Sequence, residues 1–421
     1  MAKRRKAPGD AALPTPTPAP ETPPAGPTLP PAAYAPALNA GLQAIASRVQ
    51  EMHQAISGTT FDQLQRVPGL AVPTRIVQGV HDAVSQGVYA AVRHGAGAAL
   101  SLAAGAERLT TDPTRVPGRK EQGLRSALNA AVGDALADSG SALAVQMSLH
   151  TDGVPLPLTP AALATLRPRV CLFIHGLGCD ELSWALRTDA WGESAWAHAL
   201  PPEQPMQYGA LLAHELGVSA IALRYNTGLP IDANARRLAV LLEVAARAAP
   251  QVREWLPIGH SMGGLVARSA HAIAAAEGLT WAKRTPMIIC LGSPHQGAPL
   301  ERIGHLASAA LNMTSVTQPL AKIANARSQG IKDLRHGLKG SAAPAAPPAL
   351  RLVYATLGDE ADSLVGKVLG DGLVMAGSAA DEGSGGDVER VELAGLGHMS
   401  LLNHPRVYAV IRRWLEAPEI V

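Results

Sequence analysis

From Arg169 onward, the sequence alternates short apolar runs with longer segments of helical periodicity. The run Val170–Ile174 contains no polar residue, as is typical of a strand that is covered on both faces. This alternation predicts an α/β fold with a mostly parallel central sheet flanked by helices. Further strands are expected at 219–223, 255–258, 287–291, 350–355 and 388–393, and helices at 231–248, 262–276 and 405–415. Before Arg169, a strand is expected at 142–150, with a turn at Asp152 and Gly153.

The 421 residues are enough for one large domain and a smaller N-terminal element. Residues 1–36 are rich in proline and predict a disordered tail. Residues 37–140 have apolar side chains at helical spacing, which predicts an N-terminal helical region. Residues 141–421 then form the sheet domain, with a helical insertion at 298–340.

The net charge of +2 comes without clustered lysine and arginine, so no nucleic-acid partner is expected. The three cysteines, an odd number without metal-type spacing, indicate a reducing compartment and no disulfide framework. The basic start Met1–Lys6 is followed by a Pro-rich tract and no apolar segment, so we expect a cytoplasmic protein.

The Ala/Gly-rich segment 95–106 is shorter than the ~20 apolar residues that span a bilayer. Helical packing is the favoured interpretation of this segment. Peripheral contact with a membrane through residues 37–109 stays open as a hypothesis, since their apolar residues recur at helical spacing.

Ser261 lies in the motif Gly-His-Ser-Met-Gly, residues 259–263, between a strand candidate and a strong helical pattern. Such a motif at a strand-to-helix turn holds the serine in a strained backbone conformation, and side chains larger than glycine at 259 and 263 would clash. In this context the motif predicts that Ser261 is a nucleophile, with Gly259 and Gly263 in support. The alternative is an ordinary glycine-rich turn.

A serine hydroxyl needs a base, a carboxylate that orients the base, and donors for the oxyanion. The segment Phe-Ile-His-Gly-Leu-Gly, residues 173–178, ends the first buried strand in a glycine-rich loop. Such a loop and the residue after the nucleophile each supply one backbone N–H, which predicts Leu177 and Met262 as the donors, with Gly176 in support. His175 lies upstream of the serine, so we expect it to orient the loop.

His398 follows the last strand candidate and precedes the last helix, which is where the base is expected. Its competitor His404 adjoins the start of that helix, and we expect it to cap the helix or face solvent.

Two carboxylates compete for the role of the acid. Asp371 lies between the last two strand candidates and upstream of His398, whereas Asp359 is closer to the end of the preceding strand. Asp362, Asp381 and Asp387 are expected to be solvated loop carboxylates.

Taken together, these segments resemble the lipase and GPI-inositol-deacylase-like branch of the α/β-hydrolases over residues 150–420. The resemblance rests on five elements: residues 173–178, 259–264, Gly-Ser-Pro-His-Gln-Gly at 292–297, Gly-Asp-Gly-Leu-Val at 370–374, and the loop with Gly397 and His398.

The resemblance implies an α/β-hydrolase fold, a Ser-His-Asp triad completed by Asp371, and hydrolysis of a small-molecule or lipid ester. It implies that the insertion 298–340 is a cap over an acyl pocket and that His295 is structural. No cofactor or metal is expected. Calcium in particular is not implied, because Ser400 occupies the position where some such lipases carry a calcium-binding Asp.

Two other functions remain open at this point. An acyltransferase or a polyester depolymerase would use the same triad. A non-catalytic scaffold protein with a hydrolase fold would work through the N-terminal helices. The sequence leaves the oligomeric state open.

Overall fold

The computed structural model describes most of the sheet domain and part of the N-terminal region. The described residues are 50, 54, 57–58, 61–66, 68, 71–87, 89–90, 119–138, 140–141, 143–298, 328–337, 347–357, 371, 374–381 and 386–416. The predicted tail 1–36 and most of the predicted cap insertion 298–340 lie outside these ranges.

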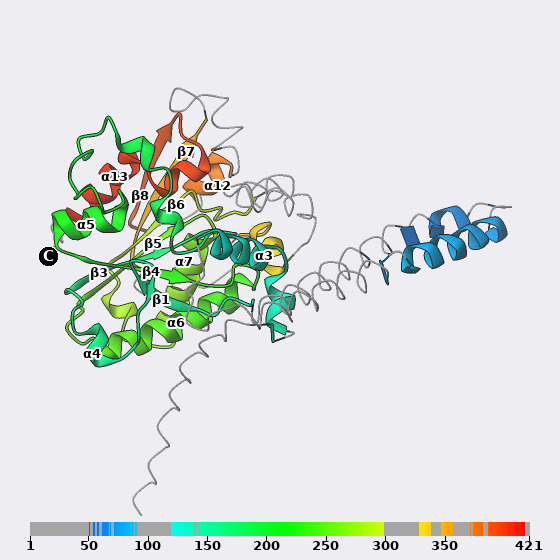
Figure 1. Ribbon diagram of the computed structural model, residues 1–421, viewed down its shortest axis with the longest axis horizontal. Helices are drawn as coiled ribbons and strands as arrows, with labels where there is room; N and C mark the ends of the chain where they lie inside the picture. The colour runs from blue at the N-terminus through cyan, green and yellow to red at the C-terminus, as the bar shows by residue number, and fades with distance from the viewer. Residues whose placement is uncertain are drawn as a thin grey trace, which may run out of the picture.

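An eight-stranded sheet forms the centre of the molecule, in the order β2-β1-β4-β3-β5-β6-β7-β8 (Figure 1). The six strands from β4 to β8 in this order pair in parallel, whereas β1 is antiparallel to both β2 and β4. The prediction of a mostly parallel sheet is therefore confirmed. The strands are β1 Ser148–Thr151, β2 Val154–Pro155, β3 Arg169–Ile174, β4 Ser219–Arg224, β5 Glu254–His260, β6 Met287–Leu291, β7 Ala349–Thr356 and β8 Val388–Ala394.

Two layers of helices cover the sheet. Helices α6 (Ile231–Ala248) and α7 (Met262–Ala276) pack on one face, and α5 (Tyr208–Leu216) and α13 (Pro405–Glu416) contribute to the core on the other. The remaining elements include α3 Arg119–Asp138, α4 Pro160–Leu163, α10 Gln329–Leu334, α12 Ala376–Ala380 and the 3₁₀ turns Ser183–Ala185, Thr188–Trp191, Ala282–Arg284 and His398–Leu402.

The packing of both faces of strand β3 explains why the run Val170–Ile174 contains no polar residue. Val170, Leu172 and Ile174 belong to the core under α6 and α7, while Cys171 and Phe173 belong to the core under α5 and α13. Successive side chains of a strand point to opposite faces, so a strand with helices on both sides must be apolar throughout.

The turn between β1 and β2 lies at Asp152 and Gly153, as the sequence predicts. Both residues have positive φ, 51° and 77°, which suits a two-residue hairpin turn between antiparallel strands. Strand β1 starts at Ser148, later than the expected strand from 142 to 150.

Helix α3 packs against the sheet domain, although its residues belong to the predicted N-terminal helical region 37–140. The side-chain amide of Asn226 donates to the Gly133 carbonyl at 2.8 Å. A Cβ at Gly228 would lie 2.1 Å from the Asn129 carbonyl oxygen, so only glycine fits at this contact. The loop after β4 is therefore in direct contact with α3.

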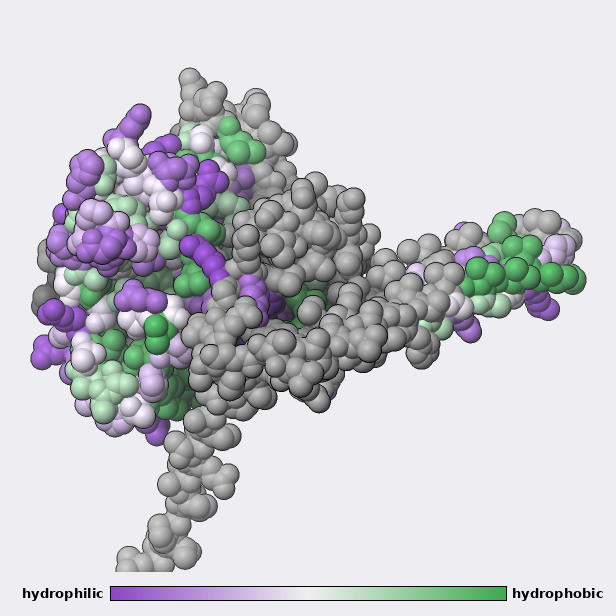
Figure 2. Space-filling model, viewed as in Figure 1, coloured by the Kyte–Doolittle hydropathy of each residue, from purple (hydrophilic) through white to green (hydrophobic). Residues whose placement is uncertain are grey.

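The helical residues 71–87 have an apolar outer side. Gln65 and Gln78 hydrogen bond to each other at 2.7 Å, and the rings of Phe61 and His81 meet edge to face at 5.3 Å, so polar groups take part in the contact between 61–66 and 71–87. Figure 2 shows hydrophobic side chains on the outer surface of this segment. They are Val72, Ile76, Val77, Val80 and Val84, each 59–67% exposed. None of the described helices has the length and hydropathy required to cross a membrane.

Candidate active site

Ser261 occupies a sharp turn between β5 and α7, with φ 53° and ψ −124°. This backbone conformation is strained for any residue other than glycine. A Cβ at Gly263 would lie 2.1 Å from the Ile174 carbonyl oxygen, and a Cβ at Gly259 would lie 2.4 Å from the Gly264 nitrogen. The expectation that larger side chains would clash at both glycines is therefore confirmed.

The end of β6 contacts the turn of Ser261 and lies close to His398 and Asp371. The Ser261 amide donates to the Leu291 carbonyl at 2.9 Å. A Cβ on the next residue, Gly292, would lie 3.2 Å from His398 Nδ1 and 3.3 Å from an Asp371 carboxylate oxygen. The Ser261 hydroxyl is itself buried and has no hydrogen-bond partner among the described residues.

His398 and Asp371 are in direct contact. His398 Nδ1 lies 2.6 Å from Asp371 Oδ2, and each side chain is only 1% exposed. A carboxylate accepts hydrogen bonds, so Nδ1 is the nitrogen that carries a proton, and in the neutral form of the ring the lone pair is on Nε2. Within the described structure, Nε2 is buried without a partner. The competing acid Asp359 lies outside the described residues.

The backbone also fixes this pair. The His398 amide donates to the Asp371 carbonyl at 3.1 Å, and the Val374 amide donates to Asp371 Oδ1 at 2.7 Å. The carboxylate and the imidazole therefore have little freedom to rotate away from each other.

His260, the residue before the serine, contacts the loop of His398. Its Nε2 lies 3.1 Å from the His398 carbonyl oxygen, and the two rings are 4.7 Å apart. Burial, followed by the neighbouring His398, lowers the pKa of His260 well below its usual value, so the ring is neutral. The sequence predicts no role for His260, because the motif constrains only the glycines and the serine.

The glycine-rich loop after β3 lies against the serine. A Cβ at Gly176 would lie 2.9 Å from Ser261 Cβ. His175 Nδ1 lies 3.0 Å from the Gly176 carbonyl oxygen, and the His175 ring stacks on Tyr225 at 4.5 Å. His175 thus contacts the loop, and burial lowers its pKa.

Leu177 and Met262 are the predicted oxyanion donors. Leu177 directly follows Gly176, and Met262 directly follows Ser261, so both backbone amides adjoin the contact between Gly176 and Ser261. Both residues are buried, at 3% and 0% exposure.

A second polar cluster involves His295 and α7. Arg268 Nη1 lies 2.8 Å from His295 Nδ1 and donates to Asp381 Oδ2 at 2.6 Å. Burial and the Arg268 charge lower the pKa of His295 to about 3. The expectation that Asp381 is a solvated carboxylate is wrong, because the residue is 8% exposed and paired with arginine.

The remaining candidates have local contacts. The Arg406 amide donates to His404 Nδ1 at 3.2 Å in the first turn of α13, which confirms that His404 caps this helix. Asp387 is exposed and pairs with Arg351 at 2.8 Å. Asp362 lies outside the described residues.

The described residues also show the state of the cysteines and whether potential metal ligands cluster. Cys171, Cys179 and Cys290 are free and buried, and burial raises the pKa of each thiol to about 12. Across those same ranges, no group of three or more His, Cys, Asp or Glu side chains is arranged to hold a metal ion.

The mostly parallel sheet and the strained serine between β5 and α7 define an α/β-hydrolase fold. More specifically, the family described as "PGAP1-like alpha/beta domain" matches residues 237–336, a segment that includes Ser261 and α7. No curated protein matches the chain.

Similar solved structures include hydrolases from three bacteria. The mature lipase BlEst2 of Bacillus licheniformis is 17% identical with a TM-score of 0.36, over 60% of this chain and 93% of that one. A lipase-esterase related protein of Clostridium acetobutylicum is 11% identical with a TM-score of 0.37, over 64% and 98%. A malate-bound esterase of Thermogutta terrifontis is 14% identical with a TM-score of 0.36, over 64% and 93%.

Five buried histidines predict that the fold loses stability in mild acid. Burial lowers the pKa of His150, His175, His260, His271 and His295. In the unfolded chain these rings take up protons near pH 6.5, so below this pH the unfolded state binds more protons. The free energy of unfolding should therefore be highest above pH ~6.5 and fall by up to ~1.4 kcal/mol per pH unit for each histidine.

Urea unfolding at pH 8.0, 6.5, 5.5 and 5.0 measures this dependence. His271, on α7, bonds to the Ala282 carbonyl at 3.2 Å. Glutamine takes up no proton in this pH range, so in His271→Gln the free energy of unfolding should fall less steeply as the pH decreases. Carboxylates whose pKa is lowered in the folded protein change the free energy of unfolding only below pH ~4.5, outside the measured range. Equal urea midpoints from pH 8.0 to 5.0 would contradict the prediction.

Proposed function

We propose that this protein hydrolyses carboxylic esters of small molecules or lipids through a Ser-His-Asp triad. The observation that carries the proposal is the buried 2.6 Å contact between His398 Nδ1 and the Asp371 carboxylate. His398 in turn contacts His260, the residue before the strained Ser261. Ser261 is the nucleophile, His398 the base and Asp371 the orienting acid.

In the first half of the reaction, Ser261 Oγ attacks the ester carbonyl carbon while His398 Nε2 takes the hydroxyl proton. The backbone N–H groups of Leu177 and Met262 donate to the oxyanion of the tetrahedral intermediate. When this intermediate collapses, the bond to the alcohol oxygen breaks, and the departing alcohol takes the proton from His398. An acyl ester on Ser261 remains.

In the second half, water attacks the acyl carbon while His398 takes a proton from the water. Collapse of the second intermediate returns that proton to Ser261 Oγ and releases the carboxylic acid. Asp371 stabilises the imidazolium during both steps and keeps Nε2 directed at the reacting oxygen. His260 supports this geometry by its bond to the His398 carbonyl.

Removal of the nucleophile gives the first test. Ser261→Ala should lower kcat on p-nitrophenyl butyrate by at least 10³-fold and abolish labelling by a fluorophosphonate probe. The matched control is Ser269→Ala, because Ser269 is a half-buried serine on the same helix α7. Wild-type turnover by Ser261→Ala would remove the proposal.

The identity of the acid gives the second test. Asp371→Asn should lower kcat by ~10³- to 10⁴-fold with little change in KM, because an amide leaves the imidazole in the wrong tautomer. Asp359→Asn should keep kcat within about twofold of wild type, since Asp371 alone is assigned to His398. A large loss in Asp359→Asn with an active Asp371→Asn would reassign the acid.

We also propose that the N-terminal helices contact a lipid surface. The support is the outward stripe of five aliphatic side chains on residues 71–87. The described segments 61–66 and 71–87 contain two arginines and two aspartates, so their charge is balanced apart from His81. Attraction to anionic lipid therefore adds little, and the apolar stripe supplies the binding energy.

Vesicle sedimentation tests this contact. The full-length protein should sediment equally with neutral phosphatidylcholine vesicles and with vesicles containing phosphatidylserine, and 0.5 M salt should not release it. Val80→Asp should abolish sedimentation, whereas Gln86→Asp, an exposed change on the same helix, should not. Failure of the wild-type protein to sediment would remove the proposal.

A further inference from the structure

The loop that carries Leu177 is held by three residues at the end of β4 and just after it, Arg224, Tyr225 and Thr227. The Tyr225 hydroxyl donates to the His175 carbonyl at 2.8 Å, and the Gly178 amide donates to Thr227 Oγ1 at 3.2 Å. Leu177 lies between these two attachment points. The direction of its N–H is therefore set by the segment after β4 rather than by β3 alone.

The third attachment is an ion pair between Glu181 of the loop and Arg224, the last residue of β4. Arg224 Nε donates to Glu181 Oε2 at 2.8 Å, and Arg224 Nη2 bonds to Oε1. The Glu181 side chain is 1% exposed and that of Arg224 is 24% exposed. Burial acts to raise the pKa of Glu181, but the hydrogen bonds and charge of Arg224 outweigh it and lower that pKa.

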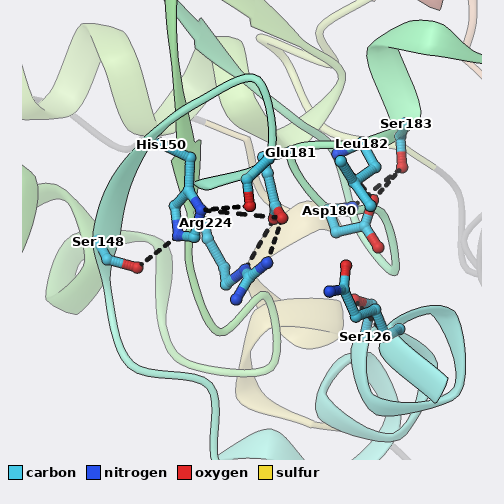
Figure 3. A network of polar contacts seen from close by, with 10 residues as sticks. Ser126, Ser148, His150, Asp180, Glu181, Leu182, Ser183 and Arg224 are labelled. Atoms are coloured by element: carbon cyan, nitrogen blue, oxygen red, sulfur yellow. Dashed lines mark hydrogen bonds and ion pairs between the residues drawn. The ribbon is translucent and has the colours of Figure 1, made fainter. Parts of the chain in front are cut away.

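Figure 3 shows that His150 and Arg224 both point toward the Glu181 carboxylate, with Ser148 beyond the histidine. The set Ser148, His150 and Glu181 has the residue types of a second triad. However, His150 Nδ1 is 4.0 Å from the carboxylate and closer, at 3.4 Å, to the Gly153 carbonyl. The carboxylate already accepts two bonds from Arg224, so its contacts serve the loop and not the activation of Ser148.

We propose that Arg224, through its paired bonds to Glu181, is a positioning residue that holds the loop of Leu177 for oxyanion binding. A buried ion pair adds little net stability, because desolvation offsets the attraction. Two parallel bonds from a planar guanidinium nevertheless fix both distance and orientation, which lysine cannot do. The inference rests on the proposed ester hydrolysis.

The hairpin of β1 and β2, at the edge of the sheet, packs beside the ion pair of Glu181 and Arg224. Ser148 Oγ bonds to His150 Nε2 at 2.9 Å, and a Cβ at Gly153 would lie 2.9 Å from Leu182. Burial and the Arg224 charge lower the pKa of His150, so the ring beside the ion pair is neutral. The carboxylate is thus shielded from water and bound chiefly to one cation.

The test measures kcat, KM and the affinity of phenylboronic acid, which forms an anionic tetrahedral adduct with a reactive serine. Arg224→Lys should lower kcat on p-nitrophenyl butyrate about 10- to 100-fold, as expected for a displaced oxyanion donor, with KM within about threefold. The affinity for the boronic acid should fall in parallel with kcat/KM. Turnover is expressed per serine titrated by fluorophosphonate, so that unfolded protein does not register as slow enzyme.

Two further variants complete the design. Arg236→Lys changes an exposed arginine paired with Asp232 on α6 and should leave every parameter unchanged. The double variant Arg224→Met with Glu181→Leu removes the buried charges together, so it should fold even if Arg224→Lys does not. It should still show the low kcat, because apolar contacts do not fix the loop.

The possible results separate a positioning role of Arg224 from a purely structural role and from failure of the proposed hydrolysis. A folded Arg224→Lys protein, or the double variant, with wild-type kcat and boronic acid affinity would overturn the inference while leaving the proposed hydrolysis intact. Full activity of Ser261→Ala would instead remove the proposed hydrolysis itself. A parallel rise in KM and loss of titratable serine, with unchanged kcat per site, would assign the pair a purely structural role.

Discussion

Close backbone contact at the serine turn is the constraint on which the rest of the site depends. Helix α7 approaches the end of β3 so closely that a methyl group at Gly263 would overlap the Ile174 carbonyl. This approach brings the loop after β3 against Ser261, which itself has a strained backbone with positive φ. The cost of that strain is offset by the burial of α7 against the sheet.

Around this turn, the buried imidazole rings of His175 and His260 are neutral. His175 and His260 are buried with lowered pKa values, and each has one ring nitrogen near a backbone carbonyl. Asp371 is the carboxylate in contact with His398. In the proposed reaction, a charge that develops on His398 would face one anion and the uncharged ring of His260, so the field around it is set by the fold rather than by solvent.

Much of this arrangement could be predicted from the sequence, because it follows local rules. The apolar run of β3 reflects burial on both faces, and the turn at Ser261 needs glycine at two fixed positions. The choice of Asp371 over Asp359 required a resemblance, since both precede the base in chain order. Helix α5 was not predicted, because a short apolar segment after a Pro-rich loop has no distinctive periodicity.

Pairings between distant charges could not be predicted. Arg224 and Glu181 are 43 positions apart, and Arg268 and Asp381 are 113 positions apart. In a sequence, each of these residues resembles a solvated surface charge. Only the order of the strands, which places β4 beside β3, brings the first pair together and buries it.

One short segment, residues 224–228, contacts two parts of the chain that are far apart in the sequence, the loop after β3 and helix α3. Its first residues hold the loop beside Ser261, and Asn226 and Gly228 hold α3. These five residues therefore contact both α3 and the loop after β3, so a substitution that displaced the segment would disturb both contacts at once.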